Sequence, residues 1–264
     1  MKYRVVVMTY KRKQFNALNL LSKDANLELY LAVRKSEYDN GYYDHLKNKH
    51  NLKFMLLTNS TDAGDTRQEI LEKCYADNID YCIQLDDAVN NLYNPKDKTM
   101  SITDCILASI NELTNNINSN KIIAMAFKEN CKYLSTMHAF ATQAFMINVK
   151  LMMSSKIKFV QTKICGFDDT TFTYEAYANN FYIIYSKNCN RDCRSWKPTI
   201  LKSGGCHIET SSIEQQIIKS NYRMQLCANY LSKYKNYKKI IKTRVEVING
   251  KEYKYDELLL PLYE

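Results

Sequence analysis

The chain has 264 residues, 45% of them hydrophobic and 25% charged, which is the balance of an ordinary globular protein. No apolar run approaches the length of a membrane span, which argues against a transmembrane protein, so we expect no membrane partner. The formal net charge of +9 is a surplus that attracts polyanions. A composition rich in Lys, Asn, Ile and Tyr, as an AT-rich genome encodes, produces the same surplus without a nucleic-acid partner.

The N-terminal residues Met1–Val5 run straight into a strand-like segment and contain no secretory h-region, so we expect a cytoplasmic protein. Nine cysteines are scattered along the chain. Cys189 and Cys193, followed by Cys206 and His207, come nearest to the spacing of zinc ligands, but no second close pair supports a zinc site. We therefore expect free thiols in a reducing compartment.

The first half of the chain predicts strands that alternate with helices. The apolar runs of strand type are Tyr3–Met8, Leu27–Val33, Phe54–Leu57, Ile79–Leu85 and Ile122–Phe127. Helices are expected around Phe15, Leu18 and Leu21, from Thr66 onward, and at Ile102–Leu113. This alternation predicts an α/β fold with a mostly parallel, Rossmann-type sheet and helices on both faces.

The second half is less regular. We expect a strand at Thr142–Val149, a loop and helix at Phe167–Asn179, a strand at Phe181–Tyr185 and a long helix at Ser211–Tyr230. Strand-like alternation over Arg244–Leu260, around Asn249-Gly250, predicts a β-hairpin. The expected organisation is one domain over residues 1–210 with a C-terminal helix and hairpin extension, residues 211–264, packed on it.

The strongest chemical signal is the pair Asp86-Asp87 at the end of an apolar strand. In open α/β sheets, ligands bind beyond the carboxyl ends of the strands. Two adjacent carboxylates repel each other unless a cation or a hydrogen-bond network compensates. Mg²⁺ and Mn²⁺ take oxygen ligands and pair with phosphates, so the pair indicates a metal that bridges to a diphosphate. An acidic turn or helix cap is the structural alternative.

A helix N-terminus is expected upstream, where Thr66-Arg67-Gln68-Glu69 has the spacing of a capping box. Arg67 would then lie in the first turn, where a cation opposes the helix dipole. That placement favours an arginine that reaches a phosphate or the Asp86-Asp87 pair; a solvated arginine is the alternative.

The first strand ends in Thr9-Tyr10-Lys11-Arg12, where Tyr10 could stack on a base and Arg12 could approach phosphates; a basic surface loop is the alternative. In Gly166-Phe167-Asp168-Asp169, either acid could be the general base that takes a proton from an acceptor hydroxyl, or an N-cap for the next helix. His207 follows Gly204-Gly205, which permits a turn that aims the ring inward, as a metal or diphosphate ligand or as an ordinary surface histidine.

These motifs, in this order, resemble those of a GT-A-fold glycosyltransferase over roughly residues 3–210. Within that fold they most resemble the glycosyltransferases associated with TET/JBP-type pyrimidine hydroxylases, which include the base J glucosyltransferase and phage DNA-modifying homologues. The motifs that carry the resemblance are Thr9-Tyr10-Lys11-Arg12, Gly64-x-x-Arg67, Gln84-Leu85-Asp86-Asp87, Ala144–Asn148, Gly166-Phe167-Asp168-Asp169 and His207.

The resemblance implies a hexosyl transfer from a nucleotide sugar, UDP-glucose, with a divalent metal, Mn²⁺ or Mg²⁺. It places Asp87 and His207 at the metal and makes Asp168 or Asp169 the catalytic base. The implied donor-binding residues are Thr9, Tyr10, Arg12, Arg67, Gln84 and Asp86. One departure is Ala88, where many such enzymes carry a third acid or a polar residue. This departure leaves two alternatives: metal binding rests on Asp87 and His207 alone, or the enzyme needs its metal less.

The family also implies an acceptor, a hydroxymethylated pyrimidine in DNA, and a phage-encoded protein in the cytoplasm of its host. The chain's own support is a tail that interleaves lysines and tyrosines, in which lysines could track phosphates and tyrosines could stack bases. The predicted DNA-binding residues are Lys235, Lys238, Lys239 and Lys242. The alternatives are one amphipathic helix for the tail and, for the protein, a glycosyltransferase acting on polysaccharide or protein, a nucleotidyltransferase, or an inactive DNA-binding relative.

Overall fold

A computed structural model describes residues 1–129, 139, 141, 143–159, 168–193, 240–248 and 251–259. The chain divides into two compact units, Met1–Cys206 and His207–Glu264, and each is described by itself. The packing of the C-terminal extension on the first domain, with a boundary at residue 210, stays a prediction.

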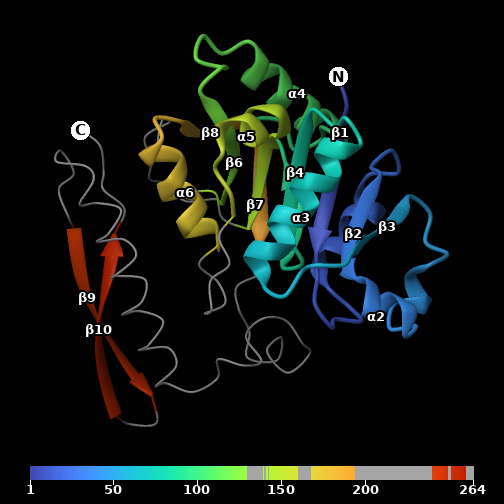
Figure 1. The fold of residues 1–264 in the computed structure, drawn as a ribbon, viewed down its shortest axis with the longest axis horizontal. Helices are drawn as coiled ribbons and strands as arrows, with labels where there is room; N and C mark the ends of the chain where they lie inside the picture. Colours follow the sequence, from blue (N-terminus) through green and yellow to red (C-terminus); the bar gives the residue numbers. More distant parts are fainter. Residues whose placement is uncertain are drawn as a thin grey trace. The chain divides into compact units, whose positions relative to one another are not determined.

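The first unit is built on a mixed sheet with the strand order β3-β2-β1-β4-β7-β6-β8-β5 (Figure 1). The strands are β1 (Tyr3–Met8), β2 (Leu29–Arg34), β3 (Leu52–Leu57), β4 (Tyr81–Asp86), β5 (Val89–Tyr93), β6 (Ile122–Glu129), β7 (Ala144–Asn148) and β8 (Tyr182–Cys193). The half from β3 to β4 is parallel throughout, and β6 pairs with β8 in parallel. Strands β7 and β5 run antiparallel to their neighbours.

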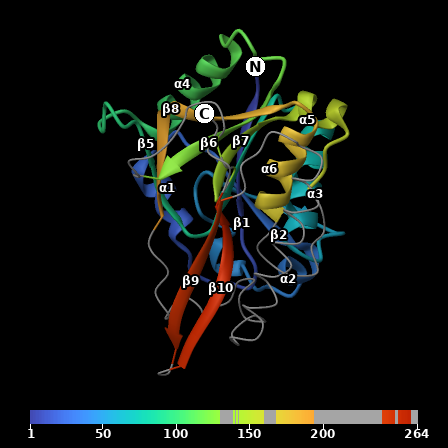
Figure 2. The same ribbon diagram turned by 90° about the vertical axis from the view of Figure 1, so that its left-hand side faces the viewer.

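Helices cover both faces of this sheet, and Figure 2 shows α3, α5 and α6 on one side with α1 and α4 on the other. Their bounds, with the 3-10 helices, are η1 (Asn16–Leu18), α1 (Asn19–Lys23), α2 (Lys35–Asp39), η2 (Asp44–Leu46), α3 (Ala63–Ala76), α4 (Ile102–Thr114), α5 (Val149–Ser155) and α6 (Asp168–Ala178). None of the helices within the described ranges combines the length and the apolar character that a membrane crossing needs.

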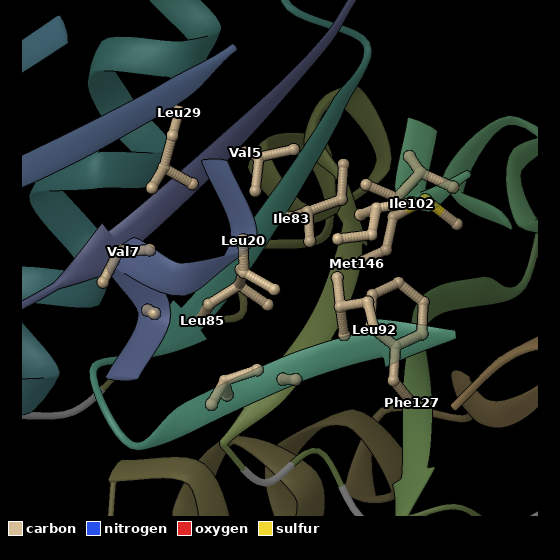
Figure 3. Close-up of a cluster of buried hydrophobic side chains, with 14 of the residues drawn as sticks. Val5, Val7, Leu20, Leu29, Ile83, Leu85, Leu92, Ile102, Phe127 and Met146 are labelled. Carbon is tan, nitrogen blue, oxygen red and sulfur yellow. The ribbon is translucent and has the colours of Figure 1, made fainter. Parts of the chain in front are cut away.

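Two cores, one on each face, fix the strands in place. Because side chains alternate along a strand, Val5 and Val7 of β1 enter one core while Val6 enters the other. The first core, drawn in Figure 3, joins β1 and β4 to Leu20 of α1 and Ile102 of α4. Each fully buried Val, Leu or Ile contributes about 1.5–3 kcal/mol relative to an exposed one. The ends of β1 and β4 are therefore held rigidly, and these ends carry the site described below.

The fold class predicted from the sequence is confirmed: an α/β domain with a Rossmann-type, mostly parallel sheet and helices on both faces, consistent with the GT-A-like arrangement. Strand β1 has the predicted bounds, and the other expected strands of the first unit lie within a few residues of the observed ones, except that β8 continues to Cys193, well past its predicted end at Tyr185. Strand β5 was not expected, because a turn of only two residues separates it from β4.

The predicted start of the third helix was wrong. The helix begins at Ala63, and its N-cap is Asp62, whose side chain accepts a hydrogen bond from the Asp65 N–H at 2.8 Å. Thr66 lies inside the first turns, where its hydroxyl donates to the Asp62 carbonyl oxygen at 2.7 Å, so it does not form the predicted capping box. The prediction failed because Asp62 competes with Thr66 for the N-cap position, and aspartate is at least as favourable there as threonine.

The second unit contains the predicted hairpin. Strands β9 (Ile240–Ile248) and β10 (Lys251–Leu259) pair antiparallel around Asn249-Gly250, as the turn signal indicated. The helix expected at 211–230 lies outside the described residues.

Candidate functional site

The site lies where β1 and β4 end side by side. The two strands are parallel, and Met8 pairs with Asp86 in their register, so the residues that follow both strands meet at one edge of the sheet. Here the Arg12 Nη1 donates to Asp87 Oδ1 at 2.7 Å, and the Thr9 hydroxyl donates to Asp87 Oδ2 at 3.2 Å. Two residues predicted from sequence as donor ligands, Thr9 and Arg12, thus both bind the predicted metal ligand Asp87.

The turn that carries Asp87 is anchored by its backbone. The Ala17 N–H donates to the Asp87 carbonyl oxygen at 3.2 Å, and the Asn16 side-chain amide donates to the Ala88 carbonyl oxygen at 3.4 Å. Ala88 therefore serves the turn through its backbone, and its methyl group offers no ligand to a metal. Asp87 is 14% exposed, and burial raises its pKa to about 6 although Arg12 opposes the shift.

Arg67 is the centre of a second, buried cluster. It lies in α3, and its side chain is only 3% exposed. Its Nη2 donates to Asp86 Oδ1 at 2.8 Å, and its Nε donates to an Asp168 carboxylate oxygen. Its Nη1 donates to the side-chain oxygen of Gln84 at 3.4 Å, and Gln84 Nε2 donates to the Arg67 carbonyl oxygen at 3.1 Å. The solvated arginine considered from the sequence is excluded by this burial.

The electrostatics of this cluster follow from its burial. Burial alone would lower the pKa of Arg67, but the carboxylates of Asp168 and Asp86 raise it overall, so the guanidinium stays charged. Burial raises the pKa of Asp86, Arg67 opposes that shift, and Asp168 adds to it. A planar guanidinium with several N–H donors can bind two carboxylates at once, which a lysine cannot do with the same geometry.

The second acidic pair opens α6. Both Asp168 and Asp169 lie in its first turn. Asp168 is buried against Arg67, whereas Asp169 is partly exposed and its carbonyl oxygen accepts a hydrogen bond from the Thr173 hydroxyl at 2.9 Å. The two neighbours thus differ in environment, one fixed by an arginine and the other nearer to solvent. The preceding Gly166-Phe167 lies outside the described residues.

Sequence reasoning missed two arginines at this edge of the sheet. The Arg34 guanidinium, at the end of β2, lies over the Tyr10 ring at 4.3 Å and donates to the Thr61 carbonyl oxygen at 2.7 Å. Arg191 of β8 is buried, donates to the Phe127 carbonyl oxygen at 3.0 Å, and opposes the rise in the pKa of Asp86. A basic residue at the end of an apolar strand was the available signal for Arg34; β8 was predicted to end before Arg191.

Several predicted residues are not placed at this site. His207, Lys235, Lys238 and Lys239 lie outside the described residues. Lys242 lies in β9 opposite Glu257, in the second unit. Cys189 is a buried free thiol, as expected, and Cys206 and His207 of the zinc alternative lie outside the described residues.

The chemistry of the described residues fits a hard divalent cation only in part. Asp86 and Asp87 supply oxygen ligands at adjacent positions, and Mg²⁺ is commonly held by one or two carboxylates plus phosphate oxygens and water. Within the described part of the chain, no three His, Cys, Asp or Glu residues are grouped so that they could hold a metal ion by themselves. The pair therefore suits a cation that arrives with phosphate oxygens of its own.

No family model matches the chain, and no curated protein matches it. Among solved structures, it is similar to a putative nucleotide-diphospho-sugar transferase from Desulfovibrio desulfuricans G20, at 11% identity over 87% of this chain and 99% of that chain, with a TM-score of 0.44. It is similar to a cytidylyltransferase from Leptospira borgpetersenii, at 13% identity over 90% and 98%, with a TM-score of 0.44. It is also similar to GalNAc-T7 with UDP, GalNAc and Mn²⁺, at 10% identity over 86% and 51%, with a TM-score of 0.45. These scores lie below 0.5, so the similarities carry no argument about activity.

Proposed function

We propose that the protein is a metal-dependent glycosyltransferase that moves a hexose from a nucleotide sugar to an acceptor hydroxyl. The observation that supports this proposal is the meeting of Arg12, Arg67, Asp86, Asp87 and Asp168 at the carboxyl ends of β1 and β4. Arginines and carboxylates in one cluster suit a ligand that brings both negative phosphates and a cation. A nucleotide sugar with Mn²⁺ or Mg²⁺ is such a ligand.

The donor would lie along the edge formed by β1, β2 and β4. Tyr10 offers a ring for the nucleobase, and we propose UDP-glucose as the donor because the motif order resembles that of UDP-glucose-dependent enzymes. Thr9 and Arg12 would contact the nucleotide and its diphosphate. The donor site would also include Gln84, Asp86 and Arg67. Arg67 acts as a positioning residue, because Asp86 and Asp168 already bind its guanidinium.

We assign the metal to Asp87 and His207, the ligands that the resemblance implies, with Asp86 next to Asp87 in the chain. When bound, the metal supplies positive charge to the departing diphosphate. Asp169 would take the proton of the acceptor hydroxyl as the oxygen bonds to the anomeric carbon and the bond to the diphosphate breaks. Asp168 is less suited to that role, because its carboxylate is committed to Arg67.

For the acceptor we propose a hydroxymethylated pyrimidine in DNA. The support is the net charge of +9 and the lysine-rich segment of the second unit, together with the family resemblance of the motifs. Such an enzyme reaches its target atom by flipping the base out of the helix.

One assay tests the proposal. The protein is incubated with Mn²⁺ and a panel of nucleotide sugars, with and without duplex DNA that carries 5-hydroxymethyl-cytosine or 5-hydroxymethyl-uracil, and released nucleoside diphosphate is measured. We expect release from UDP-glucose that the modified duplex stimulates and that EDTA abolishes. Release that only a polysaccharide or a protein stimulates would show that this molecule, and not DNA, is the acceptor. Pyrophosphate release from a nucleoside triphosphate would show that the reaction is nucleotidyl transfer and not sugar transfer. Tight DNA binding without turnover would indicate an inactive relative.

A further inference from the structure

We propose that Arg12 is an exchangeable cation that holds Asp87 when no metal is bound and transfers to the donor diphosphate when metal and nucleotide arrive together. The inference rests on the proposed function and specifies which partner Arg12 takes when metal and nucleotide bind. It follows from a conflict between two predicted roles. Asp87 is the expected metal ligand and Arg12 the expected phosphate ligand, yet the two side chains bind each other at 2.7 Å.

Both oxygens of the Asp87 carboxylate are engaged in the structure. Oδ1 accepts from Arg12 and Oδ2 accepts from the Thr9 hydroxyl at 3.2 Å. The two side chains of the ion pair are 7% and 14% exposed, so water does not screen their attraction strongly. A metal that binds Asp87 through Oδ1 must displace this guanidinium, and a metal alone offers Arg12 no new partner.

A nucleoside diphosphate changes this balance. Arg12 binds Asp87, and Arg67 is shared by Asp86 and Asp168, so a bare divalent cation must compete with a guanidinium for each carboxylate. A diphosphate that enters with the cation provides anionic oxygens for Arg12 and releases Asp87 to the metal. Arginine pairs with phosphate as well as with carboxylate, so the exchange keeps each charge partnered.

The chain around Arg12 is suited to such a change of partner. Arg12 lies in irregular chain between β1 and η1, whereas Arg67 lies within the helix α3. Lys11, the residue before Arg12, has a φ of 49°, a left-handed conformation that is costly for a residue with a side chain. The Tyr42 hydroxyl donates to the Lys11 carbonyl oxygen at 2.6 Å and holds the loop in this conformation. Backbone strain of this kind is concentrated at ligand clamps and switch regions.

Binding of Mn²⁺ alone gives the direct test, measured at pH 8 by the electron paramagnetic resonance signal of the free ion. We expect Arg12→Gln to bind Mn²⁺ about tenfold more tightly than the wild type, because Asp87 is no longer held by a charged donor. Lys11→Gln is the matched control, since it removes the same charge from the adjacent residue without touching Asp87. It should bind Mn²⁺ within about twofold of the wild type, the size expected of an exposed charge. Arg12→Gln combined with Asp87→Asn should lose the gain.

Adding UDP should reverse the order of the two proteins. The wild type should then bind Mn²⁺ more tightly than Arg12→Gln, which lacks the partner for the diphosphate. Thr9→Val is a second variant that keeps the ion pair and frees only Oδ2, and a gain of about threefold is expected. Equal Mn²⁺ affinity of Arg12→Gln and Lys11→Gln without UDP, a gain that survives Asp87→Asn, or no Mn²⁺ binding to any variant would overturn the exchange. Failure of sugar transfer with every donor would sink the proposed function instead, and the Mn²⁺ titration would still decide the exchange.

Discussion

Arg67 and Asp168 are 101 positions apart in the chain, and the Nε of the arginine donates a hydrogen bond to a carboxylate oxygen of the aspartate. The same guanidinium binds Asp86 at the end of β4, so one buried side chain joins α3, β4 and α6. Both acids are therefore placed by an arginine that the two motifs share. This relationship converts three separate sequence motifs into one cluster.

Replacing Arg67 by Met, of similar volume, should destabilise the protein strongly. Two carboxylates would lose their buried counter-charge, which typically costs about 3–5 kcal/mol. The free energy of unfolding, measured by urea denaturation, checks this. Lys35→Met is the control, since the Lys35–Asp39 pair is more than half exposed and should contribute no more than about 1 kcal/mol. A loss for Arg67→Met as small as that of the control would contradict the role of Arg67 as the centre of the cluster.

The sequence predicted the acids well and their partners poorly. Asp86 and Asp87 stand out because an apolar strand stops at them, which is a local signal. The pairing of Arg67 with Asp168 depends on where α6 meets α3, and no local pattern carries that information. The helix start at Ala63 was missed for a related reason, because Asp62 and Thr66 both have N-cap chemistry and tertiary contacts choose between them. The sheet was predictable since its apolar runs are short and regularly spaced.

Asp87 should make the protein's stability depend on pH. Its pKa is raised from the ordinary 3.8 to about 6 in the folded state. The stability that the protonated side chain contributes is therefore fully present below pH 3.8 and is lost as the pH rises through 6. Between pH 4 and pH 8, the free energy of unfolding of the wild type should fall by about 2.4 kcal/mol relative to that of Asp87→Asn. Urea denaturation at a series of pH values measures this, and a difference that does not change with pH would contradict a raised pKa at Asp87.

Asp169 and Asp168 should respond differently to the same change. Asp169→Asn is nearly isosteric but cannot take the acceptor proton, so we expect turnover to fall about 10²-fold or more with donor binding preserved. Asp168→Asn should instead lower the free energy of unfolding, because Arg67 loses a charged partner. Steady-state turnover, donor titration and denaturation separate the two effects. If Asp169→Asn keeps full turnover while Asp168→Asn folds normally but has lost turnover, then Asp168 is the catalytic base and Asp169 is not.

The DNA-binding prediction concerns Lys235, Lys238, Lys239 and Lys242. Each lysine that neutralises a phosphate releases a counterion, so binding should weaken steeply as salt rises, with a slope of about −0.9 per contact on a logarithmic scale. Replacing all four by Ala should weaken duplex binding and flatten the slope. Of the four, Lys242 lies in β9, opposite Glu257 in the register of the hairpin.

The control for this prediction replaces four lysines of the first unit, each paired with an acid in the structure: Lys35, Lys47, Lys53 and Lys150. The control and the variant of the predicted DNA-binding lysines lose the same charge. Only the variant of the predicted DNA-binding lysines should lose DNA affinity, and both should keep the slow hydrolysis of the donor by water. Selectivity is expected from the acceptor's chemistry, because unmodified duplex lacks a hydroxymethyl oxygen that could attack the sugar. We therefore expect transfer to duplex that contains 5-hydroxymethyl-cytosine or 5-hydroxymethyl-uracil and none to the unmodified duplex. An equal loss of DNA affinity in both variants would show that the binding depends on the net charge and not on these four lysines. Transfer to a polysaccharide or a protein, without salt-sensitive DNA binding, would remove DNA as the acceptor while leaving the sugar-transfer site in place.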